Sequence, residues 1–257
     1  MIDDPLREVA ASARLLVALD FDGTLAPLRD EPMEARMLPA ARAAVDALVA
    51  APGTVVALVS GRSLHDLREI AEHGDDSPLL LAGSHGAEFW VPGEGTITHD
   101  EDPADAALRD LLYAHALDAT RLLEGVWIEP KTFGFGVHTR RADPADAEVA
   151  DRTVDAIVQA EAPQWRRRTG HNIIEYAFRH EGKDSAIAEL RERTDAAAVV
   201  FAGDDVTDED ALRSLGSDDL GIHVGDRPTA ATLCVPDIPA LAALLTRLAI
   251  ERTALRE

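Results

Sequence analysis

A run of apolar residues long enough for one buried strand ends in two carboxylates near the start of this 257-residue chain. Residues 15–19 read LLVAL, and Asp20 and Asp22 follow with only Phe21 between them. A short apolar run without alternation is typical of a strand in a parallel sheet that is covered on both faces. A buried carboxylate is costly unless it is paired, so two acids at the end of such a strand indicate a site and constrain the fold around it.

Further apolar runs follow the same pattern, and segments with apolar residues at helical spacing lie between them. The runs occupy residues 54–62, 78–83, 197–205 and 220–225, and the helical segments occupy 39–50, 63–73 and 182–194. Strands that alternate with helices are typical of βαβ units around a parallel sheet. We therefore predict an α/β fold.

The middle of the chain has a different pattern. Residues 87–100 predict a hairpin that turns at 92–95, helices are expected over 103–121 and 144–161, and antiparallel strand pairs are expected within 125–140 and 164–178. Two helices on one antiparallel sheet make a compact α+β unit. We predict that this unit, residues 104–177, is inserted into a core made of residues 1–103 and 178–257.

Polar residues follow three of the predicted core strands. Asp20 and Asp22 end the first run, Ser60 ends the second, and Asp204 and Asp205 end the run at 197–205. The carboxyl ends of strands in an open α/β sheet form the crevice in which ligands bind. Clustered carboxylates repel one another unless a cation holds them, and Mg²⁺ is the cation that prefers such oxygen ligands.

The turn after the two acids carries Gly23 and Thr24. A glycine there lets the backbone approach a ligand closely, and a phosphate is the anion that such turns most often bind. One acid is then suited to attack phosphorus, and the other to protonate the departing oxygen.

Each of these features also has an ordinary structural interpretation. Two acids around one residue often form a turn or a helix cap, and Ser60 is as well suited to capping the helix that follows. The acids of residues 204–209 favour the start of a helix, and Lys183 fits a solvated first turn. The order of all four features at strand ends favours the functional interpretation.

The composition limits the classes of binding partner that we expect. Lys and Arg number 25 against 47 Asp and Glu, which gives a net charge of −22. We expect neither a nucleic acid nor an anionic membrane as a partner, because a surface this acidic repels both. The single cysteine, Cys234, and the absence of a basic, apolar leader or an 18-residue apolar run predict a cytoplasmic protein.

Four motifs of the chain resemble, in order and spacing, those of the haloacid-dehalogenase-like (HAD) phosphatases. They read DFDGTL at 20–25, SGR at 60–62, GK at 182–183 and GDDVTDEDA at 203–211. Within that superfamily, GSHGAE at 83–88 and EPKTFGFGVHTR at 129–140 are similar to trehalose-6-phosphate phosphatases. The resemblance covers residues 14–249 and implies a Rossmann-like parallel core with an inserted α+β cap domain that closes over the site.

The resemblance also implies roles for the core residues. Asp20 is expected to form an aspartyl-phosphate, and Asp22 to protonate the leaving sugar oxygen and then deprotonate the hydrolytic water. The phosphoryl group is expected to lie against Gly23, Thr24, Ser60, Gly61 and Lys183. The implied Mg²⁺ ligands are Asp20, the backbone carbonyl of Asp22 and Asp204, with Asp205 and Asp208 nearby.

The inserted unit is expected to recognise the sugar. By resemblance its binding residues are Glu129, Lys131, His138, Arg140 and Glu175; the alternative is that they are strand charges that face solvent. The chain departs from the family pattern at Pro130, Thr139 and Ala177, next to these positions. Another phosphorylated disaccharide, pseudo-disaccharide or sugar therefore remains an alternative substrate.

A second class of alternative is a phosphosugar-binding regulator that has lost catalysis, and the presence of Asp20, Asp22, Lys183 and Asp204 disfavours it. A phosphotransferase of the mutase kind is conceivable, but no second phosphate site is evident. The expected partner is a small sugar phosphate, and a monomer is favoured although the sequence does not determine the oligomeric state.

Overall fold

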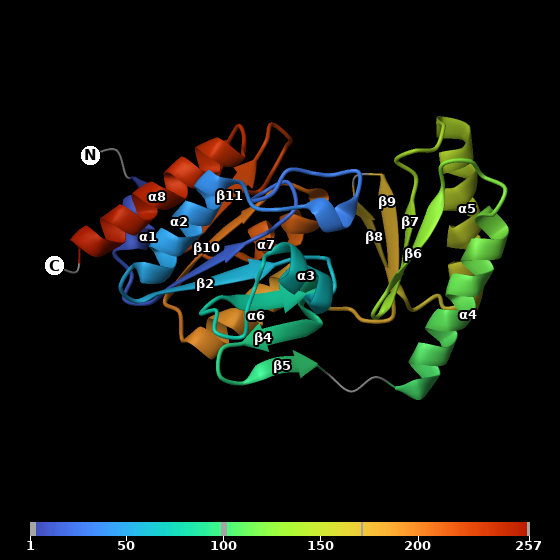
Figure 1. The fold of residues 1–257 in the computed structure, drawn as a ribbon, viewed down its shortest axis with the longest axis horizontal. Helices are drawn as coiled ribbons and strands as arrows, with labels where there is room; N and C mark the ends of the chain where they lie inside the picture. The colour runs from blue at the N-terminus through green and yellow to red at the C-terminus, as the bar shows by residue number, and fades with distance from the viewer. Residues whose placement is uncertain (1–3, 99–101, 171, 256–257) are drawn as a thin grey trace. The chain divides into compact units, whose positions relative to one another are not determined.

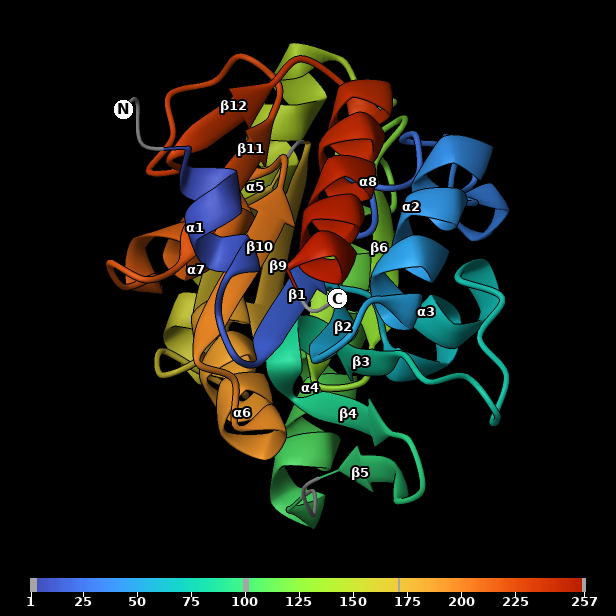
Figure 2. The same ribbon diagram turned by 90° about the vertical axis from the view of Figure 1, so that its left-hand side faces the viewer.

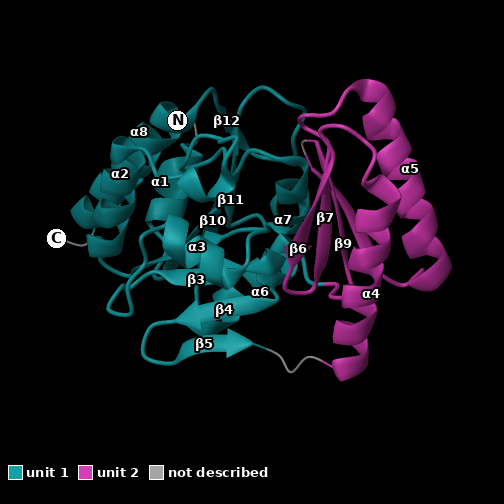
Figure 3. Cartoon of the chain, turned by 45° about the vertical axis from the view of Figure 1, so that its right-hand side comes forward, with its two compact units in different colours: residues 1–98, 181–257 teal, residues 99–180 magenta. Residues whose placement is uncertain are grey.

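The structure of the protein is a computed structural model that describes residues 4–98, 102–170 and 172–255. It divides into two compact units, residues 1–98 with 181–257 (unit 1) and residues 99–180 (unit 2), which Figure 3 shows in different colours. Unit 2 is thus inserted into unit 1 along the chain. The limits predicted for the insertion, 104 and 177, stay a prediction.

Unit 1 is built on an eight-stranded sheet with the strand order β12-β11-β10-β1-β2-β3-β4-β5. The strands are β1 Leu15–Leu19, β2 Thr54–Val59, β3 Leu80–Gly83, β4 Glu88–Val91, β5 Gly95–Thr98, β10 Ala198–Gly203, β11 Leu220–Val224 and β12 Leu233–Val235. The strands from β12 to β3 pair in parallel, whereas β4 and β5 extend the sheet as an antiparallel hairpin. The predicted α/β core is therefore present, and the last two residues of the predicted hairpin, 99 and 100, lie outside the described residues.

Helices cover both faces of this sheet (Figures 1 and 2). One face packs against α1 Pro5–Ala10, α2 Pro39–Ala50, α3 Leu64–Ile70 and α8 Ile238–Ala254, and the other against α6 Lys183–Thr194 and α7 Glu209–Ser214. In β1, Leu15, Val17 and Leu19 belong to the first cluster, and Leu16 and Ala18 to the second. Because both faces are dry, the run LLVAL contains no polar residue.

The register of the central strands brings their carboxyl ends to one edge. Leu19, the last residue of β1, is paired with Ala202 of β10 and with Leu58 of β2. Asp20 continues β1 by donating its N–H to the Ala202 carbonyl at 2.9 Å. The polar residues that follow β1, β2 and β10 therefore emerge at the same edge of the sheet.

Three short 3₁₀ turns also belong to unit 1: η1 Pro32–Glu34, η2 Ser84–Gly86 and η3 Val206–Asp208. The turn η3 follows β10, and η2 joins β3 to β4. In the described part of the chain no helix combines the length and the apolar character that a membrane span requires.

Unit 2 is a four-stranded antiparallel sheet with two helices on one face. The strand order is β6-β7-β9-β8, with β6 Trp127–Lys131, β7 Gly134–His138, β8 Arg166–Gly170 and β9 Ile173–Ala177. The helices are α4 Pro103–Thr120 and α5 Pro144–Glu161, and each begins after an aspartate N-cap followed by proline. Their apolar stripes cover Ile128, Phe135, Val137, Ile174 and Tyr176.

Strand periodicity places the other side chains of unit 2 on the face opposite α4 and α5. In β6 these are Trp127, Glu129 and Lys131, which alternate with Ile128 of the core. Their cross-strand partners include His138 of β7, and Glu175 of β9 lies on the same face. This face therefore gathers polar side chains that are far apart in the sequence.

Candidate active site

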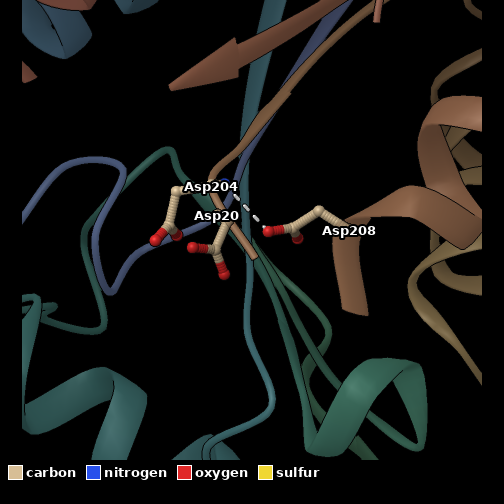
Figure 4. A group of neighbouring side chains, drawn as sticks. All are labelled: Asp20, Asp204 and Asp208. Atoms are coloured by element: carbon tan, nitrogen blue, oxygen red, sulfur yellow. Dashed lines mark hydrogen bonds between the residues drawn. The ribbon is translucent and has the colours of Figure 1, made fainter. Parts of the chain in front are cut away.

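Three aspartates meet at the carboxyl edge of the sheet in unit 1 (Figure 4). Asp20 follows β1, Asp204 follows β10, and Asp208 ends η3. One carboxylate oxygen from each lies within 4.8 Å of the other two. Asp20 and Asp208 are buried and Asp204 is partly buried, so the cluster holds several negative charges in a place that water reaches poorly.

A buried lysine neutralises part of this charge. The Lys183 Nζ donates to Asp20 Oδ1 at 2.5 Å and to Asp208 Oδ1 at 2.5 Å, and the side chain is 3% exposed. Lys183 occupies the first turn of α6, whose N-terminus is closed by a bond from the Gly182 N–H to Ser185 Oγ at 2.9 Å. The interpretation of Lys183 as a solvated lysine is therefore wrong.

The pKa values show how incomplete this neutralisation is. Burial, together with the charges of Asp208 and Asp204, raises the pKa of Asp20 well above its usual range although Lys183 opposes the change. Burial and the charge of Asp208 raise the pKa of Asp204 to about 7. Burial would lower the pKa of Lys183, but the two carboxylates outweigh it and raise that pKa. The cluster therefore has a deficit of positive charge.

A hard divalent cation fits this donor set. The Thr24 hydroxyl lies 3.1 Å from Asp20 Oδ2 and 3.3 Å from Asp204 Oδ1, so these two carboxylates face each other across a single hydroxyl. Carboxylate oxygens at this spacing are the ligands that Mg²⁺ takes in proteins. Both oxygens of Asp208 already accept bonds, Oδ1 from Lys183 and Oδ2 from the N–H groups of Asp204 and Asp205. Asp208 therefore orients the cluster.

The turn after β1 holds Gly23 tightly against Asp204. Gly23 has a φ of +82°, and a Cβ atom at this position would lie 2.1 Å from Asp204 Oδ2. Its N–H donates to the Ala26 carbonyl at 2.7 Å and thereby closes the turn. Only glycine satisfies both the backbone conformation and the close approach.

The carboxylate of Asp22 is paired with an arginine, whereas that of Asp20 is paired with Lys183. Arg62 Nε donates to Asp22 Oδ2 at 2.6 Å, and Nη2 donates to Asp22 Oδ1 at 2.7 Å. The Ser60 Oγ accepts the Arg62 N–H at 3.2 Å, and Ser60 itself is buried. The cap of α3 is Ser63, whose Oγ accepts the Asp66 N–H at 3.1 Å, so Ser60 is not the cap of this helix.

Two other predicted residues lie at the same edge with different surroundings. Asp205 accepts a bond from Arg227 at 3.2 Å and donates its N–H to Asp208, and it lies outside the group of three aspartates. Gly61 lies against His85, since a Cβ atom on Gly61 would come within 2.6 Å of the imidazole.

Unit 2 brings together four of its five predicted site residues. Lys131 Nζ lies 2.9 Å from Glu175 Oε1 and 3.4 Å from Glu129 Oε2, and His138 Nε2 lies 2.6 Å from the same oxygen of Glu129. Arg140 follows β7 by two residues. A Cβ atom on Gly136 would come within 3.4 Å of Lys131 Cε and 3.6 Å of Glu129 Oε2, so this glycine gives the charged side chains room to lie over β7.

Mutual pairing keeps this cluster charged. Burial favours the neutral form of Glu129, but His138 and Lys131 outweigh it and lower the pKa of Glu129 to about 2. Burial opposes the charge of Lys131 as well, yet Glu175 and Glu129 raise its pKa. The cluster therefore presents charged hydrogen-bond donors and acceptors in fixed positions. Recognition of hydroxyl groups requires groups of this kind.

Sequence reasoning missed the partners of two residues in these clusters. Arg62 was visible within the SGR motif, but nothing in the sequence indicated that it contacts Asp22. Trp127 stacks on His138 with ring centroids 4.4 Å apart and planes 4° apart. Its position opposite His138 follows from the strand register, which the sequence did not specify.

Comparisons with known proteins identify the family that this chain resembles. The profile of the family described as trehalose-phosphatase matches residues 18–233. A trehalose-phosphate phosphatase of Mycobacterium marinum is 34% identical over 257 residues, which cover 94% of this chain and 63% of that protein. A protein of Mycobacterium tuberculosis named uncharacterized glycosyl hydrolase is 35% identical over 249 residues, which cover 88% of this chain and 18% of that protein. The chain spans less than two thirds of either relative.

A solved structure shares the fold. The C-terminal domain of the trehalose-6-phosphate phosphatase of C. albicans matches with a TM-score of 0.80 and 20% identity, over 95% of this chain and 95% of that chain. At this identity the match establishes the fold alone. It confirms the predicted fold class, an α/β parallel-sheet core with an α+β insertion.

Proposed function

This chain belongs to the trehalose-phosphatase family, and we propose that it hydrolyses trehalose 6-phosphate to trehalose and phosphate. The observation that carries the proposal is the pairing of Asp20 with Lys183 beside two further aspartates at the carboxyl edge of the sheet. This arrangement combines a nucleophile with a buried cation, and phosphoryl transfer depends on positioning and charge neutralisation.

The first half of the reaction uses both acids of the DFD segment. An oxygen of Asp20 attacks phosphorus and forms an aspartyl-phosphate, while the bond from phosphorus to the sugar oxygen breaks. Asp22 gives its proton to that oxygen, so trehalose leaves as a neutral alcohol. Lys183 holds Asp20 in position and reduces the repulsion between its carboxylate and the phosphate.

The second half of the reaction regenerates the enzyme. Asp22 takes a proton from a water molecule, and the resulting hydroxide oxygen attacks phosphorus. The bond from phosphorus to Asp20 then breaks, which releases phosphate and restores the Asp20 carboxylate. Ser60, Gly61 and Thr24 are the proposed contacts of the phosphoryl oxygens, with Gly23 shaping the turn. The atoms balance as one water consumed for each sugar phosphate hydrolysed.

Asp20 and Asp204, with the backbone carbonyl of Asp22, are the proposed ligands of Mg²⁺, and Asp208 and Asp205 support them. The bound ion supplies positive charge that offsets the carboxylates and the phosphate. The raised pKa values of Asp20 and Asp204 support this assignment, because a deficit of positive charge is what a cation corrects.

We assign recognition of the sugar to unit 2. Glu129, Lys131 and Glu175 provide charged donors and acceptors that are already paired, and His138 fixes Glu129 from one side. Sites of this kind reject a ligand that lacks the matching hydroxyl groups, because their polar groups are then left unpaired. Arg140 is included in the proposed set on the resemblance alone.

Trapping the intermediate tests the proposal. When the reaction is quenched during turnover and digested, mass spectrometry is expected to find one phosphoryl group on the peptide that contains Asp20. Asp20→Asn is expected to give neither the phosphopeptide nor phosphate release. Phosphate release from trehalose 6-phosphate that survives Asp20→Asn would contradict the mechanism.

One structural observation favours a second candidate, a different phosphorylated disaccharide or sugar. Ala177, one of the positions that depart from the family pattern, ends β9 directly opposite Arg166 of β8. An alanine next to an arginine changes the size and the charge of the polar face.

A cytoplasmic location also belongs to the proposal. It is supported by the single cysteine of the chain, which is free.

A further inference from the structure

The carboxylate of Asp22 is held by two parallel hydrogen bonds from one arginine. The Arg62 guanidinium reaches Oδ2 through Nε at 2.6 Å and Oδ1 through Nη2 at 2.7 Å. This fork-to-fork geometry fixes the orientation of both planar groups, which a single bond would not do. Asp22 is 25% exposed, so without this partner its side chain would be free to rotate at the edge of the site.

The two acids of the DFD segment are thus held by different cations. Asp20 is bound by Lys183 and Thr24, and the side chain of neither residue forms a hydrogen bond or ion pair with Asp22 in the described part of the chain. The arginine that binds Asp22 comes from the loop after β2, on the opposite side of β1 from β10. Each acid therefore has its own positioning group.

The backbone of Arg62 is itself fixed. Its N–H donates to Ser60 Oγ at 3.2 Å, and its carbonyl accepts the Ser84 N–H at 2.6 Å. The Ser84 hydroxyl donates to Glu88 Oε2 at 2.6 Å, and the same oxygen accepts the Leu64 N–H at 3.1 Å. The buried carboxylate of Glu88 thus clamps Leu64, two residues after Arg62, to Ser84, which binds the Arg62 carbonyl.

The clamp requires an unusual backbone. Ser84 and His85 have φ values of 48° and 58°, in the left-handed region that residues with a side chain rarely adopt. The His85 N–H donates to the Ser60 carbonyl at 2.9 Å, so this conformation adds another bond to the same loop. This strained segment therefore makes two hydrogen bonds with the loop, one to Ser60 and one to Arg62, and holds it in place.

We infer that Arg62 is a positioning residue that orients Asp22 as the proton donor and acceptor of the reaction. The inference rests on the proposed function, since it deepens the role assigned there to Asp22. A rigidly anchored guanidinium that binds both oxygens of a carboxylate limits the directions in which that carboxylate can face the leaving oxygen. Arg62 acts through Asp22 and need not touch the phosphate.

The test is a double-mutant cycle with Arg62→Gln and Asp22→Asn, measured with two substrates. The value of kcat/KM covers formation of the aspartyl-phosphate and departure of the alcohol. Trehalose 6-phosphate has a leaving group that needs a proton, whereas the nitrophenolate of p-nitrophenyl phosphate leaves without one. Arg62→Gln is expected to lower kcat/KM about 10- to 100-fold for the first substrate and less than about 3-fold for the second.

The cycle also separates an indirect role from a direct one. In the Asp22→Asn background, Arg62→Gln is expected to cause less than about a 3-fold further loss, because the group through which it acts has already been removed. If the two substitutions instead lower kcat/KM independently, so that the fold losses of the single variants multiply in the double variant, the inference is overturned. Equal losses for both substrates, or a matching loss of inhibition by inorganic phosphate, would also overturn it, because they indicate that Arg62 binds the phosphate itself.

Two further variants control for folding and for charge. Arg42→Gln removes an arginine that pairs with Glu72 at 3.2 Å and is expected to leave both substrates unaffected. Arg62→Lys keeps the charge but not the two parallel bonds, and it is expected to remain impaired with trehalose 6-phosphate. Full activity of Arg62→Lys would overturn the inference. Failure of the proposed function is recognised separately: the wild type would then release no phosphate from trehalose 6-phosphate, or Asp22→Asn would leave that release unchanged, and the inference would fall with either result.

Discussion

Replacing Arg252 by methionine is expected to destabilise the fold without changing the chemistry of the site. Arg252 lies on α8 and is fully buried, and its guanidinium binds the backbone at the amino ends of β1 and β2, the edge of the sheet opposite Asp20. The contacts are to the carbonyls of Ala10 at 3.0 Å, Ser12 at 2.5 Å, Pro52 at 3.0 Å and Gly53 at 2.6 Å, and to Thr54 Oγ1 at 3.1 Å.

The magnitude follows from these contacts. Methionine retains the apolar stem, but it leaves four carbonyl groups without this donor. A hydrogen bond to a charged group contributes about 1.5–3 kcal/mol, and the losses are not additive because water reaches some of the carbonyls. We therefore expect a decrease of about 3–5 kcal/mol in the free energy of unfolding, well below the sum for four such hydrogen bonds.

Urea unfolding followed by circular dichroism measures this change, and phosphate release measured below the transition reports on the site. Arg247→Met is the matched control on the same helix, because Arg247 is half exposed and pairs with Asp4 and Glu251 near the surface. We expect the control to change stability by less than about 1 kcal/mol. A loss for Arg252→Met as small as that of the control, or an altered kcat/KM in the folded variant, would exclude this purely structural role of Arg252.

Three further predictions concern the two clusters. Gly23→Ala places a Cβ atom 2.1 Å from Asp204 Oδ2, so we expect kcat to fall about 10- to 100-fold and half-maximal activity to require more Mg²⁺; an unchanged Mg²⁺ titration would contradict this. Lys183→Met removes the cation that holds Asp20, and stopped assays of phosphate release are expected to show a loss of about 10²- to 10³-fold, whereas a loss below 10-fold would exclude this role. The pKa of Glu129 is lowered from 4.5 to about 2, so its pairing stabilises the protein fully above pH 4.5, and this stabilisation is lost as the pH falls toward 2. The midpoint of urea unfolding should therefore decrease more between pH 6 and pH 3 for the wild type than for Glu129→Gln. Equal decreases would contradict the pairing.

The arrangement of the acids was predictable because parallel strands pair in register. The run LLVAL has no polar residue, which identified β1 as buried on both faces, and the aligned ends of β1 and β10 then bring Asp20 and Asp204 together. The division into a parallel core and an antiparallel insertion followed from a change in periodicity along the chain. These features depend on backbone geometry that short sequence patterns determine.

The interactions of individual side chains were not predictable in the same way. The sequence suggested that Asp208 lies near a metal, but both its oxygens bind Lys183 and backbone N–H groups. Arg62 and Asp22 are 40 residues apart, and their contact depends on the conformation of the loop after β2, which η2 holds by hydrogen bonds to Ser60 and Arg62. Such contacts depend on rotamers and loop conformations, which are set by tertiary structure.

Some elements of the fold were also missed. Strand β12 has three residues, Leu233–Val235, and only its pairing with β11 makes it a strand. Helix α1 has six residues and owes its stability to Leu6 and Val9, which are buried against the core. Elements this short have no periodicity that a sequence pattern could reveal.

Hydrolysis of trehalose 6-phosphate by this protein is best tested by measuring kcat/KM for it beside glucose 6-phosphate, sucrose 6-phosphate and p-nitrophenyl phosphate, each with Mg²⁺ and with EDTA. We predict activity that EDTA abolishes and a strong preference for trehalose 6-phosphate. We also predict that Lys131→Met loses this preference and retains hydrolysis of p-nitrophenyl phosphate. Activity that survives EDTA, or metal-dependent activity with trehalose 6-phosphate among the poor substrates, would contradict these predictions.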